Sequence, residues 1–214
     1  MKMYKYQDRG RVLKIFEELK NQARTKAFLD VLKAHHNETY EHSLRVAQLS
    51  IDLALENRLP ARIVKIIGKA GLLHDYGKSR IDERVLSKQG PLDPKEASMM
   101  KKHPRLGVVE LEKYLSPETR KIIISHHEFK VVSYPRVPLE RREGIRETTR
   151  ERRGKYSISY FTQIVAAADM YDALIFPRSY KEGYPVEKVK SIMTEQFIGK
   201  PILINQLTKK ILNG

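Results

Sequence analysis

The chain has 214 residues, of which 41% are hydrophobic, and a formal net charge of +15. A chain of this length can bury one substantial core, so we expect a single globular domain. It contains no cysteine, which excludes disulfide bonds and thiolate metal ligands and is typical of a reducing compartment. The polar N-terminus does not read as a signal peptide, and no apolar run reaches the roughly 18 residues of a membrane span. We therefore expect a cytoplasmic protein without membrane contact, whose positive charge attracts polyanions.

The first apolar pattern along the chain is helical and spans residues 10–35. Its apolar positions recur at helical spacing at Val12, Ile15, Phe16, Leu19 and Ala23. This pattern predicts one amphipathic helix, which would pack against the rest of the domain or against a second subunit of a homodimer. We therefore divide the chain into an N-terminal helix (1–34) and a main domain (35–214).

The next helical segment carries an acidic residue and a histidine on one face. Glu38 and His42 are four positions apart, and an apolar stripe follows them. Residues four apart on a helix are neighbours, so both side chains can reach the same site. Imidazole and carboxylate groups are ligands of first-row metals, which makes this pair a candidate for metal binding.

A second candidate pair lies where a predicted helix ends. An apolar helical pattern follows Pro60 and stops at His74 and Asp75, and Gly77 then permits a turn. An adjacent histidine and aspartate at a helix end can face two neighbouring metals, with the carboxylate bridging them. Lys78 follows at the mouth of this turn, where its ammonium group can meet an anionic phosphate.

Further candidate ligands lie at the ends of later helical segments. His103 precedes a proline and a new apolar run, and the pair His126 and His127 follows a helix that Ser116 is predicted to cap. Asp169 and Asp172 interrupt an otherwise apolar helix. A buried carboxylate is costly unless it binds a metal or a partner. We expect Asp169 to be a ligand and Asp172 to support one.

Two more helices are predicted in the C-terminal part, over 184–197 and 200–213, and Pro185 suits the first turn of the former. We find no strong strand alternation anywhere in the chain. The patterns therefore predict an all-α protein.

Together these positions form an ordered series of candidate metal ligands. The eight residues are Glu38, His42, His74, Asp75, His103, His126, His127 and Asp169. Their number predicts a site with two or more divalent metals, and such sites cleave phosphate esters with an activated water. Mixed imidazole and carboxylate ligands favour iron or manganese, with nickel and zinc as alternatives.

The series resembles the HD superfamily of metal-dependent phosphohydrolases, and most closely its HD-GYP subfamily, whose members hydrolyse cyclic di-GMP. The words that carry the resemblance are EHSLRVA, GLLHDYGK, KKHPRLG, ISHHE and AAADMYDAL followed by PRSYK, so it covers roughly residues 35 to 185. The resemblance implies a single HD-domain helical bundle in which a metal-bridging hydroxide attacks phosphorus. Asp75 and Lys78 would then be catalytic, and Glu38 matches a residue that holds a third metal in some members. Arg178 and Lys181 match a basic pair that binds the substrate phosphate together with Lys78.

The sequence departs from the subfamily after the paired histidines. The glycine-rich GYP loop is missing, and only Tyr134 and Pro135 are left of the tripeptide. A charged insertion over about 129–155 stands in its place. The basic side chains within residues 136–155 could bind the phosphates of a nucleic acid. The alternatives to a cyclic dinucleotide phosphodiesterase are therefore an HD-type nucleotide or oligonucleotide phosphohydrolase, and a non-catalytic module that binds a nucleotide, RNA or protein and keeps the metal site.

Overall fold

The computed structural model describes residues 6–131, 158–177 and 182–210. These residues form α-helices and short 3-10 helices, and their only strand-like pairing is one isolated bridge between Lys130 and Phe197. The predicted all-α fold is therefore confirmed. None of the helices described is both long and apolar enough to cross a membrane.

The helices follow one another through short connections. Those of the first half are α1 (Arg9–Lys20), α2 (Ala23–His35), α3 (Asn37–Glu56), α4 (Ala61–Leu73), η1 (Tyr76–Arg80), α5 (Glu83–Leu86) and α6 (Pro94–Met100). Those of the second half are α7 (His103–Leu111), η2 (Glu112–Tyr114), α8 (Pro117–Ser125), α10 (Ile158–Ile175), α11 (Val186–Gln196) and α12 (Pro201–Thr208). Most candidate ligands therefore lie at or beside helix ends.

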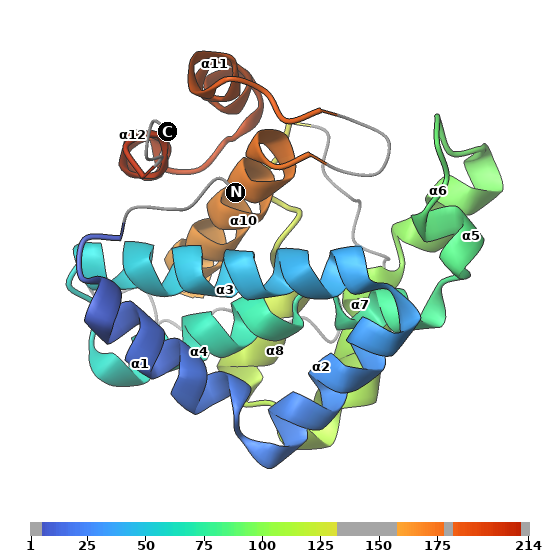
Figure 1. The fold of residues 1–214 in the computed structure, drawn as a ribbon, viewed down its shortest axis with the longest axis horizontal. Coiled ribbons are helices and arrows are strands. Elements are labelled where there is room, and N and C mark those ends of the chain that lie inside the picture. Colours follow the sequence, from blue (N-terminus) through green and yellow to red (C-terminus); the bar gives the residue numbers. More distant parts are fainter. Residues whose placement is uncertain (1–5, 132–157, 178–181, 211–214) are drawn as a thin grey trace.

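The central element of the fold is α3, which crosses the molecule and packs against α4, α10, α2 and α1 (Figure 1). Its side chains Leu49, Ile51 and Leu53 point in different directions around the helix, and all three are fully buried. Residues 49–54 are all buried, so this part of α3 is covered on all sides, and His42 on its first half is buried as well. The position of α3 therefore fixes His42 inside the molecule.

The prediction of one helix over residues 10–35 is wrong. The helix stops at Lys20 and restarts at Ala23, and α1 and α2 meet at an angle in Figure 1. Asn21 caps α1, because its backbone N–H donates to the carbonyl of Glu17 and its side chain donates to the Glu17 carboxylate. Asparagine favours helix ends over helix interiors, because its short side chain can bond to nearby groups. The break lets both helices bury apolar side chains in the common core.

The segment of α5 and α6 projects from the body of the molecule (Figure 1), and neither helix contains a buried residue. Local hydrogen bonds hold α6 instead. Asp93 accepts from the backbone of Glu96, whose side chain accepts from the backbone of Asp93. This reciprocal capping satisfies N–H groups at the start of the helix without help from a core.

The two predicted C-terminal helices are present as α11 and α12, although α12 ends at Thr208 and is shorter than predicted. Both pack against α10. Beyond α12, Lys210 is buried, and its ammonium group lies 2.6 Å from Asp52 and 2.7 Å from Glu56 near the end of α3. The C-terminal helices are therefore tied to the central helix by charge as well as by apolar packing.

Candidate metal centre

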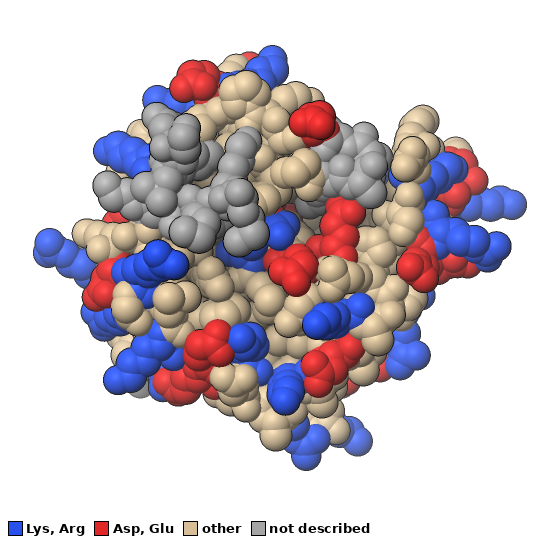
Figure 2. All heavy atoms as spheres, in the orientation of Figure 1, with Lys and Arg blue, Asp and Glu red and all other residues tan. Residues whose placement is uncertain are grey.

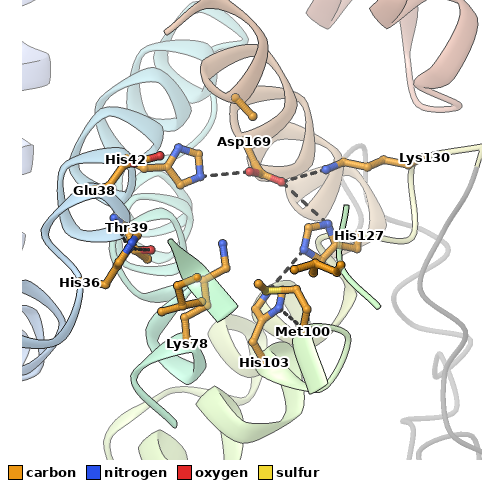
Figure 3. A pocket seen from close by; sticks show the side chains of 13 residues that line it. His36, Glu38, Thr39, His42, Lys78, Met100, His103, His127, Lys130 and Asp169 are labelled. Atoms are coloured by element: carbon orange, nitrogen blue, oxygen red, sulfur yellow. Dashed lines mark hydrogen bonds and ion pairs between the residues drawn. The ribbon is translucent and has the colours of Figure 1, made fainter. Parts of the chain in front are cut away.

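Five of the candidate ligands, far apart in the sequence, line one cavity (Figure 3): Glu38, His42, His103, His127 and Asp169. His74, Asp75 and His126 are grouped with His42, His103 and His127 beside it. His42 comes from α3, His74 and Asp75 follow α4, His103 begins α7, His126 and His127 follow α8, and Asp169 lies on α10. All of these side chains are buried except that of His127, which is partly buried. The structure thus brings seven of the eight predicted ligands into one cluster.

The first ligand group consists of His42, His74 and Asp75, whose ligand atoms all lie within 4.8 Å of one another. Asp169 adds a second carboxylate, because its Oδ1 lies 3.1 Å from Nε2 of His42 and 3.9 Å from Nε2 of His74. Two imidazoles and two carboxylates around one point are a suitable donor set for a divalent first-row metal.

The second ligand group consists of His103, His126 and His127, again with ligand atoms within 4.8 Å of one another. Nε2 of His103 lies 3.4 Å from Nε2 of His126 and 3.2 Å from Nε2 of His127. Three imidazole nitrogens that face one another without protons between them repel, and a shared cation removes this repulsion.

Asp75 faces both groups. Its Oδ1 lies 3.1 Å from Nε2 of His103, and its Oδ2 lies 3.4 Å from Nε2 of His74. Each oxygen of this carboxylate therefore points to a different ligand group, as a bridging ligand requires. Lys78 donates to Oδ2 from 2.6 Å, so the lysine predicted to meet phosphate lies beside the bridge.

Three of the histidine rings are oriented by the same local device. In each, Nδ1 lies within hydrogen-bond distance of the carbonyl three residues earlier: His74 with Gly71 (2.9 Å), His103 with Met100 (2.7 Å) and His126 with Ile123 (2.6 Å). A carbonyl only accepts, so Nδ1 must carry the proton in each ring. In the neutral ring Nε2 then keeps its lone pair, which is the form that binds a metal, and it lies near the other candidate ligands.

His42 is oriented by a carboxylate instead. Its Nδ1 lies 2.7 Å from Asp172, which also accepts from Nε and Nη2 of Arg45 at 2.8 and 3.1 Å. Burial raises the pKa of Asp172, but His42 and Arg45 outweigh this and lower it, so the carboxylate stays charged. Asp172 thus supports His42, in agreement with the sequence analysis. Arg45 was not predicted as part of the site, although its position three residues after His42 on the same helix was a usable signal.

The electrostatics favour the metal-binding protonation state of Asp75, Asp169, His126 and His127. Burial alone would raise the pKa of Asp169, but Lys130 and His42 hold that pKa well below its ordinary value. Burial would also raise the pKa of Asp75, but Lys78 and His74 hold that pKa well below its ordinary value. Burial, followed by neighbouring cationic groups, holds the pKa of His126 and of His127 well below 6.5. Near neutral pH the carboxylates are therefore charged while these two imidazoles are neutral.

One buried atom indicates most directly that this donor set fits a metal. Nε2 of His74 is fully buried and makes no hydrogen bond to any residue the structure describes. A buried polar atom without a partner is destabilising. The nitrogen points toward Asp75 and Asp169, and a divalent cation between them would satisfy all three.

The cavity beside these ligands has a volume of about 290 Å³. Glu38 lines it next to His42, and the apolar side chains of Leu86, Leu92 and Met100 form part of its wall. Lys130, which the sequence analysis did not single out, also lines it and donates to Asp169 from 3.2 Å. The predicted substrate contacts Arg178 and Lys181, and the insertion from 132 onward, lie outside the described residues.

Comparison with known proteins finds a matching family and several relatives. Residues 39–174 match the HD domain family. The chain is 31% identical over 167 residues to a cyclic di-GMP phosphodiesterase of Pseudomonas aeruginosa, and 36% identical over 155 residues to one of Thermotoga maritima. These matches cover 77% and 71% of this chain but only 37% and 38% of the two relatives, so the chain spans little more than a third of their length.

Among solved structures, the HD domain of the L. monocytogenes phosphodiesterase PgpH, in complex with cyclic-di-AMP, superposes with a TM-score of 0.56. The match covers 86% of this chain and 92% of that one at 16% sequence identity, so it speaks for the fold alone. Its helical architecture is the one that the sequence resemblance implied. From the matched residues, the relatives and the fold together, the chain belongs to the HD domain family.

Proposed function

We propose that this protein hydrolyses a phosphodiester bond of a cyclic dinucleotide, with cyclic di-GMP as the preferred substrate. The observation that carries the proposal is the pair of ligand groups joined through Asp75. Two relatives, 31% and 36% identical to this chain over the aligned residues, are named for cleavage of cyclic di-GMP. Since the chain spans only part of their length, the activity of the whole protein belongs to this proposal.

In the proposed site, His42, His74, Asp75 and Asp169 hold one divalent metal, and Asp75, His103, His126 and His127 hold the other. Bound metals supply Lewis-acid chemistry, because they make water a nucleophile near neutral pH and offset charge on phosphoryl oxygens. The chain itself fixes the orientation of the ligand side chains. Carbonyl groups orient three imidazoles and Asp172 orients the fourth. Iron or manganese is the expected metal, and Glu38, which lines the cavity beside His42, is the proposed ligand of a third ion.

The cavity offers two kinds of surface to a nucleotide. The ligands and Lys78 form a charged surface, whereas Leu86, Leu92 and Met100 form an apolar one. A phosphate suits the former because the ammonium group of Lys78 can neutralise oxygen charge as it develops. A nucleobase suits the latter, because its flat face is apolar. Arg178 and Lys181 remain predicted phosphate contacts.

The proposal also includes a cytoplasmic location, in line with the absence of cysteine. Nucleic acid binding through residues 136–155 and a homodimer remain predictions. On the described part of the face in Figure 2, basic and acidic side chains alternate and do not gather into one basic patch. This mixture favours a small anionic substrate in the cavity over a long polyanion on that face.

A turnover assay tests the proposal. The protein, reconstituted with manganese or iron, is offered cyclic di-GMP, 3′3′-cGAMP, cyclic di-AMP and a short oligonucleotide, with Asp75→Asn as the matched inactive variant. We expect cyclic di-GMP to be cleaved fastest, and Asp75→Asn to lose at least about 100-fold in kcat/KM, because one carboxylate serves both ligand groups. Metal-loaded protein that cleaves none of the cyclic dinucleotides would show that the proposal is wrong.

A further inference from the structure

Lys130 occupies a fixed place beside the candidate ligands. It lies three residues after His127, in the stretch where the sequence departs from the HD-GYP pattern. Two backbone hydrogen bonds attach this stretch to residues 196–198: Val131 N–H to Gln196 O (2.8 Å) and Ile198 N–H to Phe129 O (3.1 Å). The backbone of Lys130 is therefore held on both sides by the segment between α11 and α12, and its side chain leaves from a defined point.

The side chain of Lys130 extends to the ligands. Its Nζ lies 3.2 Å from Oδ2 of Asp169, and 26% of the side chain is exposed. Lys78 approaches the cavity from another side and pairs with Asp75 at 2.6 Å (Figure 3). Each of the two carboxylates in the cluster is thus paired with one lysine that lines the cavity.

We propose that Lys130 is a substrate-binding residue that contacts the phosphate undergoing hydrolysis, across the cavity from Lys78. This proposal rests on the proposed function. Among the residues the structure describes, Asp169 is the only acidic partner of Lys130. A divalent metal held by Asp169 neutralises the carboxylate and weakens this ion pair. The ammonium group then lies beside the ligands without a full counter-charge, and its flexible four-carbon stem can turn to a phosphate oxygen.

Position and charge both favour phosphate over any other substrate group. The part of the substrate that meets the metal ligands is the phosphate, and Nζ is one hydrogen bond away from one of those ligands. An ammonium group binds phosphate as a compact point charge with three donors. The competing explanation is that Lys130 only orients Asp169. In that case its loss would weaken metal binding, while binding of phosphate to fully loaded protein would be unchanged.

The test compares Lys130→Ala, Lys130→Arg and the control Lys14→Ala, which removes the same charge from the exposed face of α1. Each metal-loaded protein is measured for metal content, for KM and kcat on cyclic di-GMP, and for the Kd of inorganic phosphate by calorimetry. We expect Lys130→Ala to raise both KM and Kd by about tenfold or more, since a charge-assisted hydrogen bond is lost. The value of kcat should change by less than about threefold, with metal content unchanged. Lys130→Arg should restore most of the affinity, and Lys14→Ala should match the unaltered protein.

Unchanged KM and Kd in Lys130→Ala would overturn the proposal, and so would a loss of affinity that is fully explained by lost metal. Phosphate binding does not need turnover. If the unaltered protein cleaves no cyclic dinucleotide, the proposed function fails, while the effect of Lys130 on phosphate binding is still measured.

Discussion

At the residue scale, the site places charged carboxylates and neutral imidazoles side by side. Metal binding requires charged carboxylates and neutral imidazoles. The two lysines and His42 keep the acids ionised, while burial keeps His126 and His127 neutral. Asp75 and Asp172 have different roles, since Asp75 faces both ligand groups, whereas Asp172 contacts His42 of the first group together with Arg45.

Because Asp75 and Asp172 have different roles, we predict that replacing each of them by asparagine affects metal binding unequally. Asp75→Asn should weaken metal binding in both groups, because each group loses a carboxylate oxygen. Asp172→Asn should weaken only the group that contains His42, by about 10- to 100-fold, as is usual for residues that orient a ligand. Stepwise metal titration followed by calorimetry separates the two outcomes. Equal losses in both variants would show that the roles of the two acids are assigned incorrectly.

The imidazoles also predict how the stability of the metal-free protein depends on pH. Burial lowers the pKa of His36, His103, His126 and His127 below 6.5. It acts in the same direction on His74, but there Asp75 and Asp169 prevail and raise the pKa. Below pH 6.5 the unfolded chain therefore binds protons at four histidines where the folded chain resists them, and among the histidines with a shifted pKa only His74 acts in the opposite sense.

The free energy of unfolding of metal-free protein should consequently fall as the pH is lowered from about 7 to about 5.5, because protons then bind preferentially to the unfolded state. Urea denaturation at a series of pH values in the presence of a chelator measures this. A free energy of unfolding that is constant or rises over this interval would contradict the assignment of neutral buried imidazoles.

At the element scale, the second ligand group depends on the close approach of η1 and α7. A Cβ atom on Gly77 would collide with the carbonyl of His103. The glycine of the HDYGK stretch therefore does more than permit a turn, because it lets the His103 backbone come close to Asp75. The two elements could not pack in this way with any larger residue at that position.

We accordingly predict that Gly77→Ala destabilises the fold by about 1–3 kcal/mol through overpacking, and that it also lowers metal occupancy in the group containing His103. Gly10→Ala on α1 is the control, since a Cβ there meets nothing closer than 3.8 Å. Thermal unfolding and metal analysis of both variants provide the comparison. A Gly77→Ala protein with unaltered stability and metal content would exclude this packing argument.

The positions of the ligands on their helices could be predicted from the sequence, whereas one helix boundary and one cavity residue could not. The ligand series was predictable because each ligand lies in a local pattern, such as the i, i+4 spacing of Glu38 and His42 or the helix end at His74. The break between α1 and α2 was missed because it lies within an otherwise continuous apolar pattern, where Asn21 at the end of α1 is a weak local signal. Lys130 was missed because its place depends on a backbone bridge to residues 196–198, and no local sequence pattern indicates such a bridge.

At the scale of the whole molecule, charge ties both ends of the described chain to α3. Lys210 beyond α12 pairs with Asp52, and the backbone N–H of Gln7 donates to the same carboxylate. Asp52 is fully buried, and burial raises its pKa despite Lys210. This arrangement holds α12 against the central helix and, through residues 196–198, supports the stretch that contains Lys130.

Lys210→Met should therefore destabilise the protein by about 3–5 kcal/mol, because it leaves a buried carboxylate without its cation. Lys209→Met, at the exposed neighbouring position, should change stability by less than about 0.5 kcal/mol. Denaturant unfolding of the two variants tests this. A similar small effect in both would mean that the buried ion pair does not hold the C-terminal helices.

The central claim is that Asp75 joins two metal-ligand groups in one chain. The most direct test is elemental analysis of protein reconstituted with manganese or iron and freed of excess metal, with helix content checked on the same sample. The two groups predict at least two metal ions per chain, and three if Glu38 also binds one. A stoichiometry of one or none in a protein that keeps its helical fold would contradict the account.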